Sequence, residues 1–248
     1  MPRARDRKYW NYWSGMVKAS IARNTVELPA FLSIVDFEGK KVLDAGAGIG
    51  RAAFKINGFA KSIACVDESK VALQKLNAEI RKKGLQGKIK ARFGNIRELP
   101  FKSNSFDIAY SLWVLHHYKR DWQGVLKELN RVCKKQGCVI VCFSTEKGSI
   151  PRLEAIARAN EIKLRKEFAK KVLRFLKKLN GNSFVKTARL PFYFKTPSWA
   201  FEVLSETFLP KPLTALQEKK CREFLKKHSS KKGCFLDEEA AFVYSFKT

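Results

Sequence analysis

Three alternating glycines that follow a short apolar stretch are the feature that most constrains how this chain folds. The sequence VLDAGAGIGR occupies residues 42–51, and its first part has the apolar, β-branched character of a buried central strand. Alternating glycines permit a tight turn that brings backbone N–H groups close to a ligand. The glycines of this turn are Gly46, Gly48 and Gly50. A strand that runs into such a turn and then into a helix predicts a binding site for a nucleoside-containing cofactor.

The spacing of the glycines narrows the choice of cofactor. A dinucleotide fingerprint reads G-x-G-x-x-G, with its third glycine one position later than here. Arg51 stands at that later position, so the spacing disfavours NAD and FAD. A second acid, Asp67, follows the strand-like residues 62–66, about twenty residues beyond the first glycine, where a ribose-binding acid is expected.

Strand-like and helical segments alternate after the glycine turn. The strand-like runs are residues 62–66, 89–93, 105–110 and 139–143, and the helical runs between them include residues 71–80 and 125–132. This alternation predicts a parallel sheet with helices on both faces and ligands at the carboxyl ends of the strands. We therefore expect an α/β fold: a doubly wound, Rossmann-like sheet of seven mostly parallel strands, with a helical cap inserted after the fifth strand.

The pattern changes beyond Thr145. The basic stretch from Arg152 to Lys178 has apolar residues at helical spacing and is expected to form one long cap helix, with its apolar stripe as a packing face. No repeat or linker interrupts the chain, so we expect a single domain spanning residues 1–248. Its expected parts are a cofactor-binding core at about 39–145, a helical cap at about 146–182 and 197–232, and final strands at about 184–195 and 239–247.

Composition agrees with a globular protein. A chain of 248 residues with 45% hydrophobic content can bury one substantial core. No apolar run approaches the ~20 residues of a membrane span, and the N-terminal residues lack the apolar stretch of a secretory signal, so we expect a cytoplasmic protein. The six cysteines form no CxxC pair and are expected to be reduced, apolar side chains, with no metal site.

The net charge of +27 raises the question of an acidic partner. Dense lysine and arginine gain affinity for nucleic acid because phosphate contacts release counterions. The basic residues are spread along the whole chain, however, which is equally consistent with a generic solvated surface. The charge therefore has two interpretations: a surface that binds RNA or another acidic partner, or a generic solvated surface.

Four motifs together resemble the core of a known family. VLDAGAGIGR, CVDES, GNIRELPFKSNSFDIAYSLWVLHHY and LKELNRVCKKQGCVIVCF are similar, in order and spacing, to the S-adenosylmethionine (SAM)-binding core of the class I methyltransferases that include the ubiquinone/menaquinone-biosynthesis type. The resemblance covers residues 41–143. The chain departs from the family at Lys135-Gln136, where a Pro-Gly is frequent, but that turn is remote from the cofactor.

The resemblance implies SAM as the cofactor and a set of contacts to it. The glycines would pass under the methionine part, Asp44 would lie near its ammonium group, and Asp67 would accept hydrogen bonds from the ribose hydroxyls. From the residues alone, Asp67 has an alternative role as a helix N-cap and Asp44 as a turn-former. The implied SAM-contacting residues are Asp44, Gly46, Gly48, Gly50, Asp67, Glu68, Asn95, Ile96, Ser111 and Leu112.

A second, narrower resemblance concerns the acceptor. The glycine loop with its arginine, the Trp113-Val114 pair before His117, and the closing residues 243–246 are similar to the protein α-N-terminal methyltransferases. In that family the residue matching Arg51 contacts the SAM carboxylate, and the one matching His117 helps deprotonate the substrate amine, a task suited to imidazole. The family's Asp-Asn pair after the fifth strand is replaced by Ser144-Thr145. A lone histidine such as His117 can also be a pocket-edge residue.

Aromatic residues supply the remaining candidates for the substrate site. The N-terminal cluster of Tyr9, Trp10 and Trp13 is expected to fold over the cofactor cleft, because so dense an aromatic set would be unfavourable in solvent. It could equally pack as a strap, or stack on bases of a single-stranded RNA loop. The full candidate pocket is Tyr9, Trp10, Trp13, Trp113, His116 and Tyr193.

These observations predict a SAM-dependent methyltransferase and leave several acceptors open. The segment after the fourth strand has no (Asp/Asn)-Pro-Pro-(Tyr/Phe) motif and no Pro-Cys pair, which disfavours methylation of base amines and of cytosine C5. RNA or another acidic macromolecule is the first candidate acceptor because of the net positive charge of the chain. A protein N-terminal amine, a small molecule in an apolar pocket, and a SAM-binding scaffold without activity are the alternatives.

Overall fold

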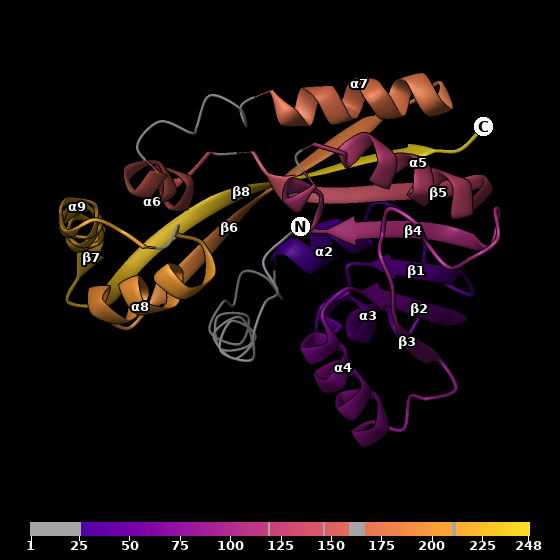
Figure 1. The fold of residues 1–248 in the computed structure, drawn as a ribbon, viewed down its shortest axis with the longest axis horizontal. Helices are drawn as coiled ribbons and strands as arrows, with labels where there is room; N and C mark the ends of the chain where they lie inside the picture. The colour runs from indigo at the N-terminus through magenta and orange to yellow at the C-terminus, as the bar shows by residue number, and fades with distance from the viewer. Residues whose placement is uncertain (1–25, 119, 146, 159–166, 210–211) are drawn as a thin grey trace.

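A central sheet organises the fold (Figure 1). The computed structural model describes residues 26–118, 120–145, 147–158, 167–209 and 212–248. The strand order is β3-β2-β1-β4-β5-β8-β6, with β7 pairing only with the start of β8. Neighbours among the first five strands run parallel, whereas β8 is antiparallel to both β5 and β6. The strands are β1 Lys41–Ala45, β2 Ser62–Asp67, β3 Ile89–Phe93, β4 Phe106–Leu112, β5 Cys133–Ser144, β6 Phe184–Phe194, β7 Ser229–Ser230 and β8 Gly233–Phe246.

The predicted doubly wound α/β fold is thereby confirmed, with the two-residue β7 as an eighth strand. Within the described residues, no helix is both long and apolar enough to cross a membrane. The helices are α2 Leu28–Leu32, α3 Arg51–Ile56, α4 Lys70–Lys82, α5 Trp122–Val132, α6 Ser149–Arg158, α7 Phe168–Asn180, α8 Pro197–Thr207 and α9 Ala215–Lys227, with a short 3-10 turn, η2, at Leu115–His117.

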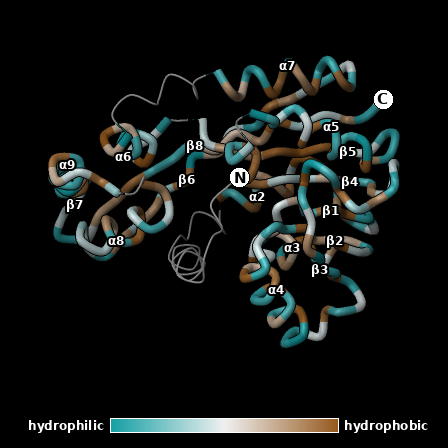
Figure 2. The backbone as a smooth tube through the Cα atoms, viewed as in Figure 1, coloured by the Kyte–Doolittle hydropathy of each residue, from teal (hydrophilic) through white to brown (hydrophobic). Residues whose placement is uncertain are grey.

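Both faces of the sheet are covered, which explains why its inner strands are apolar throughout. In β5, residues 137–143 are all buried, as expected for a strand with helices on either side. One apolar cluster contains the inward faces of α2, α3 and α4, and a second contains those of α5 and α7. Hydrophobic residues accordingly concentrate in the central strands in Figure 2, whereas the outer helices are mixed.

The cysteines belong to this apolar interior. All six thiols are free and buried, which agrees with their interpretation as reduced, apolar side chains. Burial raises the pKa of Cys133 to about 12, so this thiol stays protonated at neutral pH.

Strands β6 and β8 extend beyond the rest of the sheet and carry the cap. Only residues 240–246 of β8 pair with β5, whereas β6 pairs with β8 along its whole length. The extended part forms a two-stranded ribbon, against which α6, α8 and α9 pack on the left of Figure 1. Two of these helices have sequence-encoded starts: Thr196 caps α8, and Thr214 forms a capping box with Gln217 at the start of α9.

The structure corrects the prediction of one long cap helix from Arg152 to Lys178. The described residues form two separate helices, α6 and α7, and only α6 packs in the cap. Helix α7 lies on β8 and α5, and its buried Val172 and Leu176 belong to the second core cluster. In both helices the apolar stripe is a packing face, as predicted, but only its α6 part faces the cap, whereas its α7 part faces the central sheet.

Truncation of Leu176 tests whether α7 is part of the core. Its side chain is fully buried, so Leu176→Ala should lower the free energy of unfolding by about 2–5 kcal/mol, because it leaves a cavity against the sheet. Urea denaturation measures this. The neighbouring, exposed Lys177→Ala is the matched control, and an equally small effect of both changes would contradict the placement.

Candidate functional site

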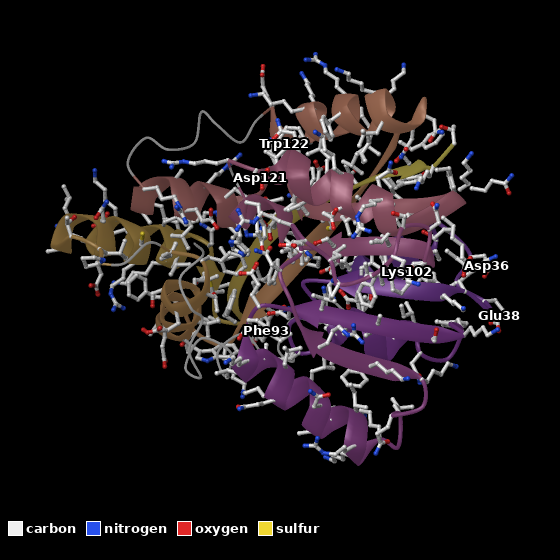
Figure 3. All side chains as sticks on the ribbon, turned by 45° about the vertical axis from the view of Figure 1, so that its right-hand side comes forward. Asp36, Glu38, Phe93, Lys102, Asp121 and Trp122 are labelled. Atoms are coloured by element: carbon white, nitrogen blue, oxygen red, sulfur yellow. The ribbon has the colours of Figure 1, made fainter. Side chains whose placement is uncertain are left out.

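The carboxyl ends of β1, β2 and β4 meet at one edge of the sheet. In register, Asp44 of β1 lies between Cys65 of β2 and Tyr110 of β4. Figure 3 labels both ends of the strands: Asp36, Glu38 and Lys102 mark the amino ends, and Phe93 and Asp121 lie on the side of the carboxyl ends. The segments that follow β1, β2, β3 and β4 therefore share one edge, as expected for a ligand site in this class of sheet.

The glycine loop is held to the end of β2 by backbone hydrogen bonds. The N–H groups of Gly46 and Ala47 both donate to the carbonyl of Val66, over 2.7 and 3.1 Å. Gly46, Gly48 and Gly50 have φ of +83°, +56° and +82°. A Cβ on Gly46 would come within 2.4 Å of Cγ2 of Val114, so both the backbone conformation and the close packing require glycine there.

Asp67 links this loop to helix α4. Its Oδ2 accepts a hydrogen bond from the N–H of Gly48 over 2.7 Å, and its Oδ1 accepts one from the N–H of Ser69 over 2.8 Å. The N-cap of α4 is Ser69, whose Oγ accepts from the N–H of Ala72, so the alternative of Asp67 as the N-cap is wrong. Each carboxylate oxygen can accept a second hydrogen bond.

Asp44 is an almost fully buried acid directly before the loop, with 3% of its surface exposed. Burial raises the pKa of Asp44 to about 7. The Tyr110 hydroxyl opposes that shift, the charge of Asp67 adds to it, and the charge of Arg51 opposes it. A buried carboxyl that titrates near neutrality is suited to meeting a cationic group.

Arg51 is held by an acid that the sequence analysis missed. Its guanidinium forms an ion pair with Glu27, which directly precedes α2 and is fully buried. Helix α2 itself packs on α3 and, through Phe31, on Tyr110. The only signal in the sequence was a lone acid between apolar residues in the stretch VELPAFL.

Glu68 also has a partner that the sequence analysis missed. The hydroxyl of Tyr118 donates a hydrogen bond to Oε1 of Glu68. Burial, with the hydrogen bond to Glu68 and its charge, raises the pKa of Tyr118 well above its usual value. Because Tyr118 follows η2, this bond joins the segment after β4 to the end of β2.

The two candidate cofactor contacts after β3 have different surroundings: Asn95 lies in a turn, and Ile96 lies in the core. Oδ1 of Asn95 accepts the N–H of Arg97 over 2.9 Å, and the side chain of Asn95 is half-buried. Ile96 is 1% exposed and packs in the second apolar cluster. Of the two, Asn95 is the one that reaches the surface of the site.

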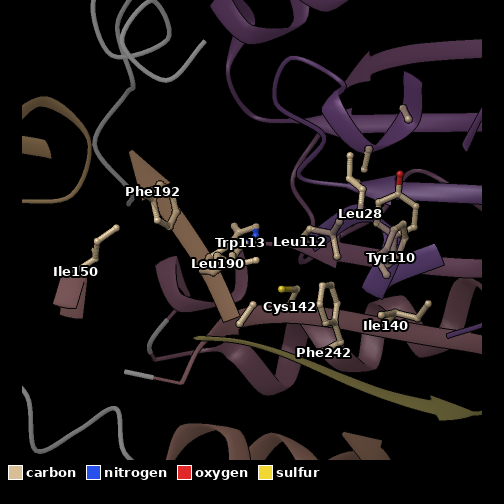
Figure 4. Packing of buried hydrophobic residues seen from close by; sticks show 14 of the residues in the cluster. Leu28, Tyr110, Leu112, Trp113, Ile140, Cys142, Ile150, Leu190, Phe192 and Phe242 are labelled. Atoms are coloured by element: carbon tan, nitrogen blue, oxygen red, sulfur yellow. The ribbon is translucent and has the colours of Figure 1, made fainter. Parts of the chain in front are cut away.

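The candidates at the end of β4 lie beneath the glycine loop and toward the cap. The Oγ of Ser111 donates to the carbonyl of Ala45 over 2.7 Å, which fixes it beneath the glycine loop. Leu112 is buried beside it. Trp113 has a φ of +61°, which is costly for a bulky residue, and its ring lies near Leu190 of β6 in the first core cluster (Figure 4).

The two histidines lie side by side on η2. Their ring centroids are 3.8 Å apart, and both side chains are half-buried. The N–H of His117 donates to the carbonyl of Val114, the residue that packs over Gly46. The structure thus brings both imidazoles to the strand end that bears the glycine loop.

Tyr193 is the exception among the described pocket candidates. Side chains alternate along β6, so Phe192 and Phe194 face the cap interior, while Tyr193 faces outward and is 40% exposed. It contacts Phe235 of β8 instead. Its assignment to a pocket with Trp113 and His116 is therefore wrong. The N-terminal candidates Tyr9, Trp10 and Trp13 lie outside the described residues.

The titration of Asp44 makes stability depend on pH in a defined direction. The folded protein holds this proton up to about pH 7, whereas the unfolded chain loses it near 3.8, the ordinary pKa of an aspartate. Wild-type stability therefore falls as pH rises between these values. Asp44→Asn does not titrate, so its stability relative to wild type should rise by about 2–3 kcal/mol between pH 5 and 8.

Urea denaturation at several pH values measures this difference. The exposed Asp36→Asn serves as the control and should show no such trend. A difference between Asp44→Asn and wild type that is independent of pH would mean that the buried carboxyl ionises normally.

Similarity to known proteins is concentrated in the region just described. Residues 43–141 match a family described as a methyltransferase domain. A sterol 24-C-methyltransferase of Pneumocystis carinii is 36% identical over 40% of this chain and 26% of its own length. An uncharacterized methyltransferase of Bacillus subtilis, YcgJ, is 30% identical over 39% of this chain and 38% of its own. The chain thus spans well under half the length of these curated relatives.

Solved structures share the fold over most of the chain. YcgJ of Bacillus subtilis superposes with a TM-score of 0.63 at 19% identity, covering 89% of this chain and 97% of that one. A Haemonchus contortus phosphoethanolamine N-methyltransferase, solved with phosphomonomethylethanolamine and S-adenosylhomocysteine, superposes with a TM-score of 0.61 at 17% identity, covering 96% and 57%. The glycine loop, the acid after β2, the strand order and the matched residues together identify residues 43–141 as a class I methyltransferase domain, whose cofactor is SAM.

Proposed function

We propose that this protein transfers the methyl group of SAM to an acidic macromolecular acceptor, with RNA as the first candidate. The observation that carries the SAM part is the carboxylate of Asp67, which lies at the end of β2 and fixes the glycine loop through the N–H of Gly48. The acceptor part is supported by charge alone.

The donor set at the strand edge fits SAM. Asp67 would accept hydrogen bonds from the ribose hydroxyls, because it places a charged acceptor at the end of β2 beside the glycine loop. Asp44 would lie near the ammonium group, which would favour its carboxylate form. Arg51 can serve the SAM carboxylate and Glu27 together, because a guanidinium has five N–H donors.

Bound SAM supplies a methyl group on a sulfonium sulfur, which is already an activated leaving group. The work left to the protein is to hold the acceptor in line and to exclude water, which can supply much of the rate enhancement. Trp113 and the η2 residues would border the acceptor, and His117 could take its proton, a role for which neutral imidazole is suited near pH 7.

The choice of RNA rests on the charge of the whole chain. A net charge of +27 favours contacts with a polyanion. The curated relatives named above match the cofactor region, so their acceptors say little about the acceptor of this chain. The cap, which lies outside the matched residues, is where an acceptor would be chosen.

A small apolar acceptor is the second candidate, favoured by the apolar cluster that joins the sheet to the cap. Trp113, Leu190, Phe192 and Ile150 belong to this cluster (Figure 4). Such a cluster suits an apolar ligand of the kind that the sterol methyltransferase is named for. For a protein N-terminal amine the support is weaker, because Ser144-Thr145 stands where that family has an Asp-Asn pair, and Oγ1 of Thr145 donates a hydrogen bond to Glu239.

Substitution of Asp67 tests the SAM site. Asp67→Asn replaces one acceptor oxygen by an NH₂ group that faces a backbone N–H, so we expect SAM affinity to fall roughly 10- to 150-fold, the loss typical of hydrogen bonds to a charged group. Isothermal titration calorimetry measures this directly.

Asp107→Asn is the matched control for that experiment. Asp107 also accepts a backbone N–H, from Lys41, and pairs with Lys134, but it lies at the amino ends of the strands. It should lower stability and leave SAM affinity unchanged. Equal losses of affinity in the two variants would contradict the proposed site.

The acceptor is tested by following the label from methyl-labelled SAM in fractionated cell extract. Label that is removed by nuclease supports RNA, whereas label removed by protease or extracted into organic solvent overturns it in favour of a protein or a small molecule. SAM binding without transfer to any fraction would support a scaffold without activity instead. Addition of polyanions should inhibit the transfer if the acceptor is RNA.

A further inference from the structure

The outward face of the β6–β8 ribbon carries two exposed aromatic rings that the proposed chemistry does not use. Tyr193 and Phe235 are paired across the ribbon, 40% and 50% exposed, with ring centroids 5.1 Å apart. Strand alternation turns them away from the cap interior, where Phe192 and Phe194 are buried. Exposed aromatic rings that lie together indicate an interaction surface.

The ring of Tyr193 packs directly against the backbone of Gly233. A Cβ built on Gly233 would lie 2.5 Å from Cε2 of Tyr193, so a residue with a side chain at this position would collide with the ring. Gly233 also has a φ of +123°, which side-chain-bearing residues rarely adopt. The two rings are thus held in place before any partner arrives, which lowers the entropy cost of binding.

Lysines flank the two rings along the chain: Lys195 follows Tyr193 by two residues, and Lys231 and Lys232 directly precede Gly233, against which the ring of Tyr193 packs. Segment 226–235 contains no aspartate or glutamate. The acids farther along the same face are already paired, Asp237 with Arg189 over 2.6 Å and Glu239 with Lys147 over 3.2 Å. In the described part of the chain, none of the flanking lysines has an ion pair. These exposed lysines are Lys195, Lys226, Lys227, Lys231 and Lys232.

We propose that this aromatic–lysine patch, formed by Tyr193, Phe235 and these five lysines, binds single-stranded RNA. Unpaired bases stack on exposed aromatic rings, and lysines contact the phosphates between them. A duplex hides its base faces, so it would use only the lysines. Two rings on a narrow ribbon suit single bases better than the broad apolar face that a membrane surface needs. The inference deepens the proposed function and rests on it for the identity of the acceptor.

Fluorescence anisotropy with a labelled single-stranded RNA, without SAM, tests the patch on the full chain. The double change Tyr193→Ala and Phe235→Ala should weaken binding roughly 5- to 150-fold or more, since one lost stacking contact has about that effect. Tyr193→Phe should retain binding because it keeps the ring. Phe184→Ala removes a ring of 46% exposure at the other end of β6 and should have no effect.

The lysines are tested by the salt dependence of binding. Lys231→Gln together with Lys232→Gln should reduce the slope of log K against log salt by about 1.4, at about 0.7 per contact for single strands. Lys177→Gln together with Lys178→Gln, on exposed positions of α7, changes the net charge equally and should leave the slope unchanged.

Competing outcomes are distinguishable. Duplex RNA bound as tightly as the single strand, or equal losses in the patch and control variants, would overturn the patch. Binding to phosphatidylserine vesicles that depends on Tyr193 and Phe235, without RNA binding, would assign the surface to a membrane instead. RNA that binds at the patch but takes no label from SAM would support the patch and reject RNA as the acceptor.

Discussion

The hydrogen bond between the carboxylate of Asp67 and the N–H of Gly48 is the contact on which the site depends. It ties the end of β2 to the middle of the glycine loop, and the second oxygen ties the same side chain to Ser69 at the start of α4. The loop can follow this path only because its glycines adopt positive φ and because Gly46 lets Val114 approach. Strand β2, the glycine loop and the start of α4 thus share one carboxylate.

Several buried acidic residues lie at the same edge of the sheet. Asp44 and Glu27 are each at most 3% exposed, and Asp67 is close enough to raise the pKa of Asp44. Burial of so much potential negative charge is unfavourable unless cations compensate it, and among the described residues Arg51 is the cation that both acids share. The pKa of about 7 for Asp44 indicates that this compensation is incomplete. A cationic ligand such as SAM would complete it, so the site is less stable alone than with its cofactor.

Local sequence patterns were sufficient to predict the fold and the cofactor, because both depend on residues that lie close together in the chain. The run from Ile89 to Phe93 is the strand predicted, the glycine spacing disfavoured dinucleotides, and the resemblance of the local motifs to class I methyltransferases implied SAM. Contacts between distant segments were missed: Glu27 meets Arg51 across 24 residues, and Tyr118 meets Glu68 across 50. The outward direction of Tyr193 depends on the register of β6 against β8, which no local pattern of the strand encodes.

Charge is distributed unequally between the cofactor site and the turn between β7 and β8. The strand edge under the glycine loop is lined by buried acids, which favours a cation, whereas the segment 226–235 around that turn has lysines and no aspartate or glutamate, which favours an anion. A polyanion drawn to the cap would be disfavoured at the acidic edge, so the charges alone would keep acceptor and cofactor in separate places. Trp113, directly after β4, is buried in a strained conformation in the apolar cluster that joins the sheet to the cap. If the acceptor is the acidic macromolecule proposed above, the part of it that takes the methyl group would have to be a neutral group, because the buried acids disfavour a further anion beside the cofactor.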